Sequence, residues 1–362
     1  MNIPVKTTDA SYEVHLGENI LQEFCVQYKT ALEKADQLVI ITDEHVWTLH
    51  EEYVREHFAF PFKVYIVPNG EACKTFESYF AVQTFLLQQS CSRNSVLFAL
   101  GGGAVGDLTG FVAATFMRGI PFYQIPTTIL AHDSAVGGKT AINHPNGKNM
   151  IGAFYQPQAV IYDFHFLATL PAMEVRSGLA EVIKHALISN VEWVNEFFAL
   201  PNIESIDKET LLQWIEKGIR VKANIVELDE KEQSFRKYLN FGHTYGHAIE
   251  ATIGYGKITH GEAVMIGMIP ALMLSEIHGN VEKGYAKKVY ELAIRLGYNF
   301  GHVLNCPFKR LAEFMLKDKK TTNGELHFAL LQEIGEPFVQ VISMSDVLIC
   351  DERLRKWIKE GM

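Results

Sequence analysis

Residues 95–110 read SVLFALGGGAVGDLTG, and this stretch decides the class of fold. The continuous apolar run at 95–100 has the length and composition of a buried strand. The glycines that follow permit a sharp turn, and we expect a helix over residues 107–117. A buried strand that turns directly into a helix is the repeating unit of a parallel α/β sheet.

The same alternation extends to both sides of this stretch. Further strands are expected at 37–42, 62–67, 122–125 and 159–162, and further helices at 19–32, 44–57 and 76–89. Residues 2–7 and 11–16 alternate between apolar and polar side chains around a short turn, which indicates a β-hairpin. These patterns predict an α/β domain over residues 1–170, with a mostly parallel sheet covered on both faces.

From about residue 171 the apolar side chains recur with the helical period of 3.6 residues. Helices are expected at 174–189, 208–227, 239–253, 261–278 and 283–296. Only 326–331 and 338–342 have strand character, and these two segments could pair. The sequence therefore predicts a second, mainly α-helical domain over residues 171–362.

Composition limits the class of partner. The net charge of −9 argues against a nucleic-acid surface or an anionic membrane. The five cysteines are odd in number and show no CxxC spacing, which is typical of reduced thiols. The first residues lack the pattern of an export signal, and the longest apolar run, 263–274, is too short to span a bilayer. We expect a cytoplasmic protein.

The glycine turn raises the question of a dinucleotide. Residues 101–106, GGGAVG, satisfy the GxGxxG pattern, and the backbone N–H groups at such a helix start bind phosphate. The usual acidic residue about twenty positions later is missing, so the carboxylates available are Asp43 and Asp107. Residues 69–74, NGEACK, add a second turn at the same edge of the sheet. A tight packing turn between strand and helix would need the same glycines, so both interpretations stay open here.

Residues 126–157, PTTILAHDSAVGGKTAINHPNGKNMIGAFYQP, gather groups suited to a small anion. Lys139 and Lys148 supply point charges for phosphate, and Asp133, Asn143 and Asn149 add polar contacts. The interleaved glycines allow the backbone to approach a ligand closely. The alternative is an ordered glycine-rich surface loop without a ligand.

The helical half contains a candidate metal site. His243 and His247 are spaced i, i+4 on an expected helix, His260 follows after a turn, and Glu181 lies upstream. A catalytic divalent ion needs three protein ligands and one open position, which Glu181 and two of the three histidines would supply. Helical spacing alone favours His243 and His247. Structural histidines are the alternative.

Taken together, these motifs resemble the 3-dehydroquinate synthases, of the sugar-phosphate cyclase group. The matching segments are GGGAVGDLTGFVAATFMRGI (101–120), the whole of 126–157, GLAEVIKHALI (178–188), LNFGHTYGHAIE (239–250) and HGEAVMIGM (260–268). Members of that family use NAD and one divalent metal, zinc or cobalt, and usually form homodimers. They convert 3-deoxy-D-arabino-heptulosonate 7-phosphate into 3-dehydroquinate and phosphate, in the shikimate route, by transient oxidation, phosphate elimination, re-reduction and aldol closure.

The resemblance also implies roles for individual residues. It makes Glu181, His243 and His260 the metal ligands and moves His247 to the substrate side. The implied catalytic and substrate-binding residues are Lys139, Lys148, Asn149, Asp133, Arg118, Lys184, Lys222, Arg236, Asn240 and His247. The implied NAD-binding residues are Asp43, Asn69, Gly70, Glu71, Lys74, Gly102, Gly103, Ala104, Gly106, Asp107, Thr127, Thr128, Leu130, Lys139, Lys148, Phe166, Leu167, Ala168, Thr169, Leu170 and Glu174.

Some details of the resemblance are less regular. Arg118 is expected to reach the substrate phosphate, in its own or a neighbouring subunit, and Lys319 or Lys320 would supply one more cation. The stretch DEKEQSFR lacks the glycine that the family commonly has before Arg236, and Cys73 stands where a polar or aromatic residue is expected.

Three other functions compete with this interpretation. A metal-dependent polyol dehydrogenase of the same fold would consume NAD and needs no lysine array. An aminocyclitol-type cyclase would differ in the residues that meet the substrate's carboxylate, and retention of Arg236, Asn240 and His247 favours a carboxylate-bearing substrate. A nucleotide sensor without catalytic activity would have no reason to retain the metal ligands together with Lys148.

Overall fold

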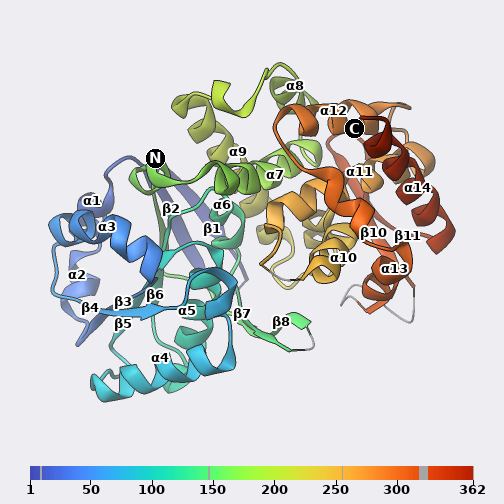
Figure 1. Cartoon of the computed structure of the whole chain (residues 1–362). Helices are drawn as coiled ribbons and strands as arrows, with labels where there is room; N and C mark the ends of the chain where they lie inside the picture. The colour runs from blue at the N-terminus through green and yellow to red at the C-terminus, as the bar shows by residue number, and fades with distance from the viewer. Residues whose placement is uncertain (9, 146, 255, 318–324, 362) are drawn as a thin grey trace. The chain divides into compact units, whose positions relative to one another are not determined.

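The computed structural model describes residues 1–8, 10–145, 147–254, 256–317 and 325–361 (Figure 1). The chain divides into two compact units. The first comprises Met1–Pro171 and Lys222–Lys231, and the second comprises Ala172–Val221 and Glu232–Met362. Among the described residues, no helix combines the length and the apolar character needed to cross a bilayer.

The first unit is built on a sheet of seven strands in the order β1-β2-β9-β6-β5-β3-β4. These strands are β1 (Asn2–Lys6), β2 (Ser11–Gly17), β3 (Leu38–Asp43), β4 (Lys63–Val67), β5 (Val96–Gly101), β6 (Phe122–Pro126) and β9 (Ala159–Asp163). The pair β1–β2 is the predicted antiparallel hairpin, and every other neighbouring pair is parallel. The prediction of a mostly parallel sheet is confirmed.

Helices cover both faces of this sheet. They are α1 (Leu21–Gln27), α2 (Lys29–Glu33), α3 (Glu44–His57), α4 (Phe76–Gln88) and α5 (Gly103–Thr115). Successive side chains of a strand point to opposite faces. Ile40 accordingly packs in one buried cluster with residues of α1 to α3, whereas Ile41 packs in another with residues of α4 and α5. Burial on both faces explains why the strands have continuous apolar sequences rather than alternating ones.

Three segments of this unit differ from the expected elements. The helix expected at 19–32 is divided into α1 and α2 at Tyr28, whose ring stacks on Phe24 and whose hydroxyl lies 3.0 Å from His15 Nε2. Helix α5 begins at Gly103, because the glycine turn itself is already helical. The segment 126–157 contains regular structure: α6 (Ala131–Ser134) and an antiparallel hairpin of β7 (Lys139–His144) and β8 (Gly147–Phe154).

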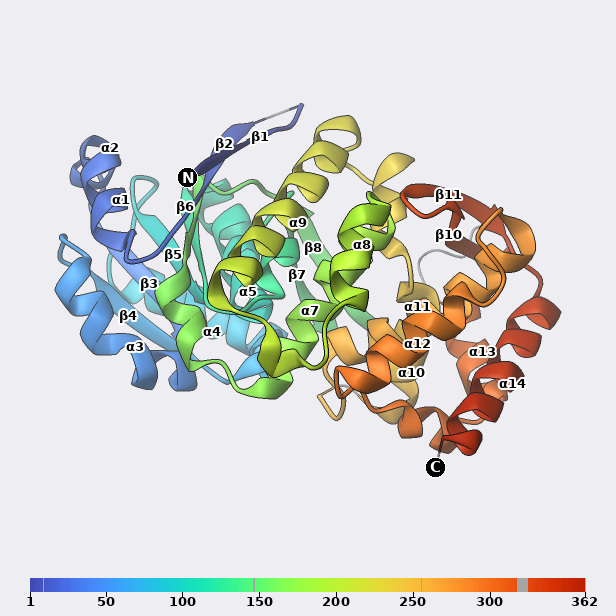
Figure 2. The same cartoon turned by 90° about the horizontal axis from the view of Figure 1, so that it is seen from above.

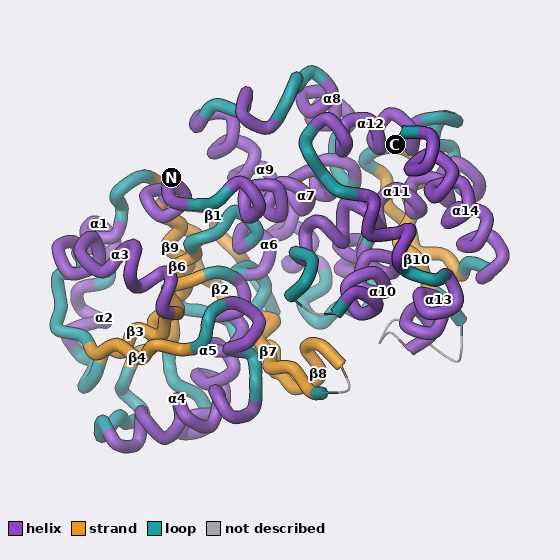
Figure 3. The backbone as a smooth tube through the Cα atoms, in the orientation of Figure 1, coloured by secondary structure: helices purple, strands orange, loops and turns teal. Residues whose placement is uncertain are grey.

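The second unit is mainly helical (Figure 3). Its helices are α7 (Ala172–Leu187), α8 (Val191–Phe198), α10 (His243–Ile253), α11 (His260–His278), α12 (Tyr285–Arg295), α13 (Phe308–Lys317) and α14 (Met344–Glu360), with most of α9 (Lys208–Leu228). The predicted pairing of two late strands is confirmed: β10 (His327–Glu333) and β11 (Glu336–Val341) are antiparallel (Figure 2). Helix α11 packs against α7, α10, α12, α14 and β10, as expected for a helix that is apolar on all sides.

Short 3-10 turns complete the two units. They are η1 (Gly70–Cys73), η2 (Phe116–Arg118), η3 (Phe164–Thr169), η4 (Ile203–Ser205), η5 (Phe235–Asn240) and η6 (Phe300–Asn305). Four of them, η1, η2, η3 and η5, contain residues predicted from the sequence as candidate binding residues.

Candidate functional site

Glycines bring the helices of the second unit into close contact. The backbone N–H of Gly261, the second residue of α11, donates a hydrogen bond of 3.2 Å to Ser177 Oγ in α7. A Cβ atom at Gly261 would lie 1.8 Å from the backbone oxygen of Ser177. A Cβ atom at Gly267 would lie 2.0 Å from the backbone oxygen of Gly242, just before α10. The backbones of α7 and α10 can therefore approach α11 only because these positions lack side chains.

This packing brings a carboxylate and two imidazoles together. The Oε1 atom of Glu181 lies 3.3 Å from Nε2 of His243 and 3.5 Å from Nε2 of His260. Two ligands bound about 2.1 Å from one tetrahedral ion lie about 3.4 Å apart, so both distances fit a shared divalent metal. This carboxylate is fully buried, and among the described residues no hydrogen bond of acceptable geometry reaches Oε1. That is the arrangement expected of groups placed around an ion.

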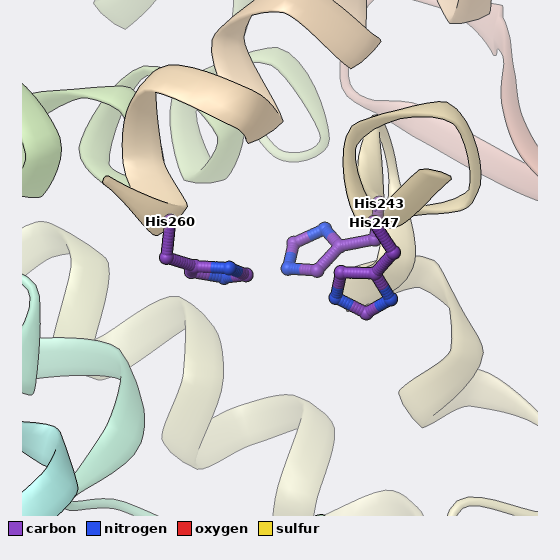
Figure 4. Close-up of side chains that lie close together, drawn as sticks. All are labelled: His243, His247 and His260. Carbon is purple, nitrogen blue, oxygen red and sulfur yellow. The ribbon is translucent and has the colours of Figure 1, made fainter. Parts of the chain in front are cut away.

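His247 completes a cluster of three imidazoles. Its ring centroid lies 5.3 Å from that of His243 and 5.7 Å from that of His260, and the candidate ligand nitrogens of the three lie within 4.8 Å of one another. Figure 4 shows the rings turned toward one another, two from α10 and one from the start of α11. Both His243 and His260 approach Glu181, and these three residues are the ligand set that the resemblance implies.

The far nitrogen of each candidate ligand is also held. The Nδ1 atom of His243 lies 3.1 Å from the backbone oxygen of Phe241, and Nδ1 of His260 lies 3.3 Å from Oε2 of Glu250. Glu250 was not among the residues predicted from the sequence. A signal existed, since positions 243, 247 and 250 follow the i, i+4, i+7 spacing of one helix face.

A buried lysine sets the charge of the carboxylate. Lys184 Nζ lies 2.5 Å from Glu181 Oε2, and both side chains are buried. Burial alone would raise the pKa of Glu181, but the Lys184 ammonium and His243 outweigh it and hold the pKa well below its usual value. The carboxylate is therefore charged at neutral pH, as a metal ligand must be.

Two further predicted residues lie in η5, directly before α10: Arg236 is buried, and Asn240 Nδ2 donates to Glu232 Oε1 over 2.8 Å.

In the first unit, the glycine turn lies at the carboxyl ends of β5 and β6. The backbone N–H of Thr127 donates to the oxygen of Gly101 over 3.0 Å. A Cβ atom at Gly102 would lie 3.1 Å from Thr128 Cγ2, and one at Gly103 would lie 2.8 Å from Ser134 Oγ. The buried Thr127 Oγ1 has no hydrogen-bond partner among the described residues. A glycine-lined turn at the start of a long helix, with an unsatisfied hydroxyl beside it, fits a phosphate-bearing ligand.

The other predicted nucleotide residues near this turn have mixed roles. Ala104 and Gly106 belong to the first turns of α5, and Leu130 directly precedes α6. Asp43, at the end of β3, accepts a hydrogen bond of 2.9 Å from the backbone N–H of Val46 and so caps α3. Asn69 directly precedes Gly70, whose backbone is left-handed, and Asn69 Oδ1 accepts a hydrogen bond of 3.2 Å from the backbone N–H of His45.

A buried ammonium joins three segments of this unit. Lys74 Nζ donates to Asp107 Oδ2 over 2.6 Å and to Asn149 Oδ1 over 2.5 Å, although its side chain is only 2% exposed. Burial raises the pKa of Asp107, and the Lys74 ammonium offsets this only in part. The start of α5, the η1 turn and the β7–β8 hairpin are thus held together by one cation. Asn149 adopts a left-handed backbone with φ of 56°, which asparagine tolerates better than most residues.

A second set of contacts connects η1 to the same hairpin. Lys148 Nζ lies 3.3 Å from Glu71 Oε1, and Asn143 Nδ2 donates to Glu71 Oε2 over 2.9 Å. Asn143 Oδ1 also accepts from the backbone N–H of Asn149. Asn143, which the sequence indicated as a possible anion contact, here fixes the hairpin that presents Lys148.

The remaining predicted residues are more dispersed. Lys222 Nζ lies 2.7 Å from Asp133 Oδ1, and Lys139 is exposed on β7. Arg118 is exposed, with φ of 71°. It follows α5, a helix of 13 residues and hence about 20 Å long, so it lies at the end opposite to Gly103. Lys319 and Lys320 fall outside the described residues.

The segment Phe166–Leu170 is anchored to α3. Phe166 is fully buried, whereas Ala168 and Thr169 are exposed. His50 Nε2 in α3 lies 3.0 Å from Thr169 Oγ1. The last predicted nucleotide residue, Glu174, lies in α7 of the second unit, where burial and then Glu262 raise its pKa.

His50 makes the stability of this unit depend on pH. Burial, then repulsion from His165 and His45, lowers the pKa of His50 to about 4. A histidine with a lowered pKa stabilises the fold above its unfolded pKa of about 6.5, and this contribution is lost as the pH falls toward 4. Between pH 7 and pH 5 the loss should be about 2 kcal/mol. In urea unfolding, the free energy of unfolding of His50→Gln should fall by about 2 kcal/mol less than that of the wild type between pH 7 and pH 5. An identical fall in the variant and the wild type would contradict the lowered pKa of His50.

Comparisons with known proteins show the family of the chain. Residues 64–177 match the family model described as 3-dehydroquinate synthase N-terminal, and residues 178–321 match the one described as 3-dehydroquinate synthase C-terminal. The 3-dehydroquinate synthase of Lysinibacillus sphaericus is 55% identical over 360 residues, covering 99% of each chain.

Two solved structures have the same fold. A 2-deoxy-scyllo-inosose synthase, complexed with carbaglucose-6-phosphate, NAD+ and Co2+, superposes with a TM-score of 0.86 at 26% identity, over 98% of this chain and 99% of that one. The 2-epi-5-epi-valiolone synthase of Streptomyces hygroscopicus gives a TM-score of 0.84 at 24% identity, over 97% and 98%.

An α/β unit followed by a helical unit with a candidate metal site, as seen here, resembles the cyclase class to which the 2-deoxy-scyllo-inosose synthase belongs. Within that class, the identity over nearly the whole chain and the two family models decide the matter. The chain belongs to the 3-dehydroquinate synthase family.

Proposed function

We propose that the chain converts 3-deoxy-D-arabino-heptulosonate 7-phosphate into 3-dehydroquinate and phosphate, using NAD and one divalent metal. The observation that carries the proposal is the approach of His243 and His260 to the buried, charged Glu181 at the spacing of metal ligands. It occurs in a chain that is 55% identical over its whole length to a 3-dehydroquinate synthase. The related cyclase structure that contains NAD+ and Co2+ supports the same pair of cofactors.

Each unit has a distinct proposed role. The second unit holds the metal through Glu181, His243 and His260, and a divalent ion so bound lowers the pKa of a coordinated hydroxyl. Histidine and carboxylate accept both zinc and cobalt. The first unit would bind NAD through the glycine turn, η1 and η3. Bound NAD+ would provide reversible hydride transfer, in which a hydride is taken from the substrate and later returned to it, so that NAD is not consumed.

The remaining cations recognise the substrate's two anionic groups. Lys139, Lys148 and Lys222 of the first unit, with Lys184 and Arg236 of the second, neutralise phosphate and carboxylate and stabilise enolate charge as it develops. No separate general base is assigned, because the leaving phosphate can itself remove the proton. A carboxylate-bearing substrate is favoured over an aminocyclitol precursor by the presence of Arg236, Asn240 and His247.

We further propose that the protein works as a cytoplasmic homodimer. Arg118 lies exposed at the end of α5 remote from the glycine turn, and the resemblance implies that it reaches the substrate phosphate of a neighbouring subunit. All five cysteines are buried and unpaired, as expected in a reducing compartment.

The direct test is incubation with heptulosonate phosphate, NAD+ and Co2+, following phosphate release and NADH absorbance. We expect phosphate release without net NADH, and loss of the reaction after a chelator. A polyol dehydrogenase would instead accumulate NADH from a simple polyol. Turnover of a sugar phosphate that lacks a carboxylate, with no reaction of the heptulosonate, would indicate an aminocyclitol-type cyclase.

The choice of ligands can be tested separately. His260→Ala should lose bound metal, because it removes one of the two imidazoles that approach Glu181. His247→Ala should retain the metal but turn over more slowly. Metal content after dialysis, measured by atomic spectrometry, separates the two sets of ligands. Retention of metal by His260→Ala and loss by His247→Ala would show that the pair at helical spacing, His243 and His247, binds the ion.

A further inference from the structure

Two carboxylates approach opposite sides of the His260 ring. Glu181 Oε1 lies 3.5 Å from Nε2, and Glu250 Oε2 lies 3.3 Å from Nδ1. The Glu250 side chain is only 3% exposed, so it is not a solvated surface charge. Burying a carboxylate costs free energy unless it makes a compensating contact, and His260 provides one.

We propose that Glu250 is a positioning residue that holds His260 in the tautomer and orientation required of a metal ligand. A neutral imidazole carries a single N–H group. With that proton on Nδ1, directed at Glu250, the lone pair of Nε2 is directed toward the Glu181 side of the ring. A carboxylate on the far nitrogen also makes the imidazole a stronger ligand. The inference rests on the proposed metal site.

The local fold explains why a side chain is needed for this task. His243 lies at the start of α10, and its Nδ1 is held by the backbone oxygen of Phe241 two residues earlier. His260 is the first residue of α11, and its Nδ1 contact comes from α10 instead. Glu250 occupies the helix face that also carries the other two histidines shown in Figure 4.

A neighbouring carboxylate, Glu262, is hydrogen-bonded within a capping box at the start of α11. Glu262 accepts hydrogen bonds from the backbone N–H and the hydroxyl of Thr259, and the Thr259 hydroxyl accepts from the backbone N–H of Glu262. This capping box fixes the backbone at the start of α11. It places His260, while Glu250 sets the rotation and tautomer of its ring.

The test is the affinity for Co2+ itself, measured from the visible absorption of the bound ion in competition with a chelator. Loss of an outer carboxylate of this type weakens metal binding about 10–100-fold, and we expect that range for Glu250→Ala. Glu250→Gln retains an acceptor oxygen without the charge and should be affected less. The matched control is Glu276→Gln: this side chain is also 3% exposed, and it accepts from the backbone N–H groups of Gly284 and Ala286. It lies near the other end of α11 and should bind Co2+ like the wild type.

Kinetics supply a second readout. If Glu250 only positions His260, excess Co2+ should restore most of kcat with little change in KM, whereas activity at limiting metal should fall with occupancy. Wild-type affinity in both Glu250 variants would overturn the inference while leaving the metal site intact. Failure of the wild-type protein to bind Co2+ would overturn the metal site and this inference together. If Glu250→Ala does not fold, the Co2+ affinity of Glu250→Gln decides whether the inference holds. If Glu276→Gln weakened Co2+ binding as much as Glu250→Gln, the effect would be a general consequence of removing a buried charge, and the inference would be overturned.

Discussion

Gly261→Ala is expected to abolish metal binding and to destabilise the second unit by about 3 kcal/mol or more. The usual effect is the opposite, since replacing glycine by alanine inside a helix stabilises the helix by about 1 kcal/mol. The reason is the 1.8 Å separation between the added Cβ atom and the backbone oxygen of Ser177. A backbone oxygen cannot rotate away, so α11 must move from α7. That movement separates His260 from Glu181, whose nitrogen and oxygen are now 3.5 Å apart.

Two control variants separate this clash from other effects. Ser177→Ala removes the hydrogen bond that the backbone N–H of Gly261 donates to Ser177 Oγ but leaves the backbone oxygen in place, and should cost only about 1 kcal/mol. Gly361 directly follows α14, and the nearest atom to a Cβ added there would be 3.5 Å away. Gly361→Ala should therefore leave the free energy of unfolding unchanged. Thermal unfolding without metal and Co2+ titration would be compared. If the double variant Gly261→Ala/Ser177→Ala recovered wild-type stability, the backbone clash would not be the cause.

The sequence predicts the fold best where burial leaves a simple pattern. The runs at 38–41 and 96–100 are apolar throughout because both faces of β3 and β5 are covered. The two late strands were predicted to pair, and they do. Helix α14 was missed although Val347, Cys350, Leu354 and Ile358 line its buried side with helical spacing. Its many charged residues conceal that stripe.

The hairpin of β7 and β8 could not be predicted in this way. Most side chains of β8 are exposed or half-exposed, so no alternation of apolar and polar residues marks it. Its structure depends on main-chain pairing, such as Thr140 with Ala153, and on side-chain contacts from η1. Contacts between residues far apart in sequence, such as Lys74 with Asn149, leave no local pattern.

The metal site shows the same limit. Helical spacing alone favoured His243 and His247, because a sequence shows which residues share a helix but not how two helices meet. In the structure, Glu181 in α7 is contacted by His243 and also by His260, from the first turn of α11. The distance between those helices depends on Gly261 and Ser177, two small residues whose importance appears only when the backbones are placed.

The second large effect is expected in the first unit, where Lys74→Met should lower the free energy of unfolding by about 3 kcal/mol. The ammonium is the cation that pairs with Asp107, at 2.6 Å, in a position where burial already raises the pKa of that carboxyl. Removing it leaves a carboxylate that is only 19% exposed without its counter-ion. The control is Lys29→Met: Lys29 pairs with Glu33 on the surface, with a side chain 64% exposed, and such pairs contribute less than about 1 kcal/mol.

A double variant separates the structural role of Lys74 from its proposed role in NAD binding. Removing one member of a buried ion pair is costly, but replacing both by neutral groups is often tolerated. Lys74→Met/Asp107→Asn should therefore recover most of the stability lost in Lys74→Met, and the coupling between the two positions should be evident in urea unfolding. Its affinity for NAD+, measured by calorimetry, should stay low, because the start of α5, η1 and the β7–β8 hairpin are no longer joined by a cation. Recovery of both stability and NAD+ affinity would mean that Lys74 only balances the charge of Asp107 and has no part in binding the nucleotide.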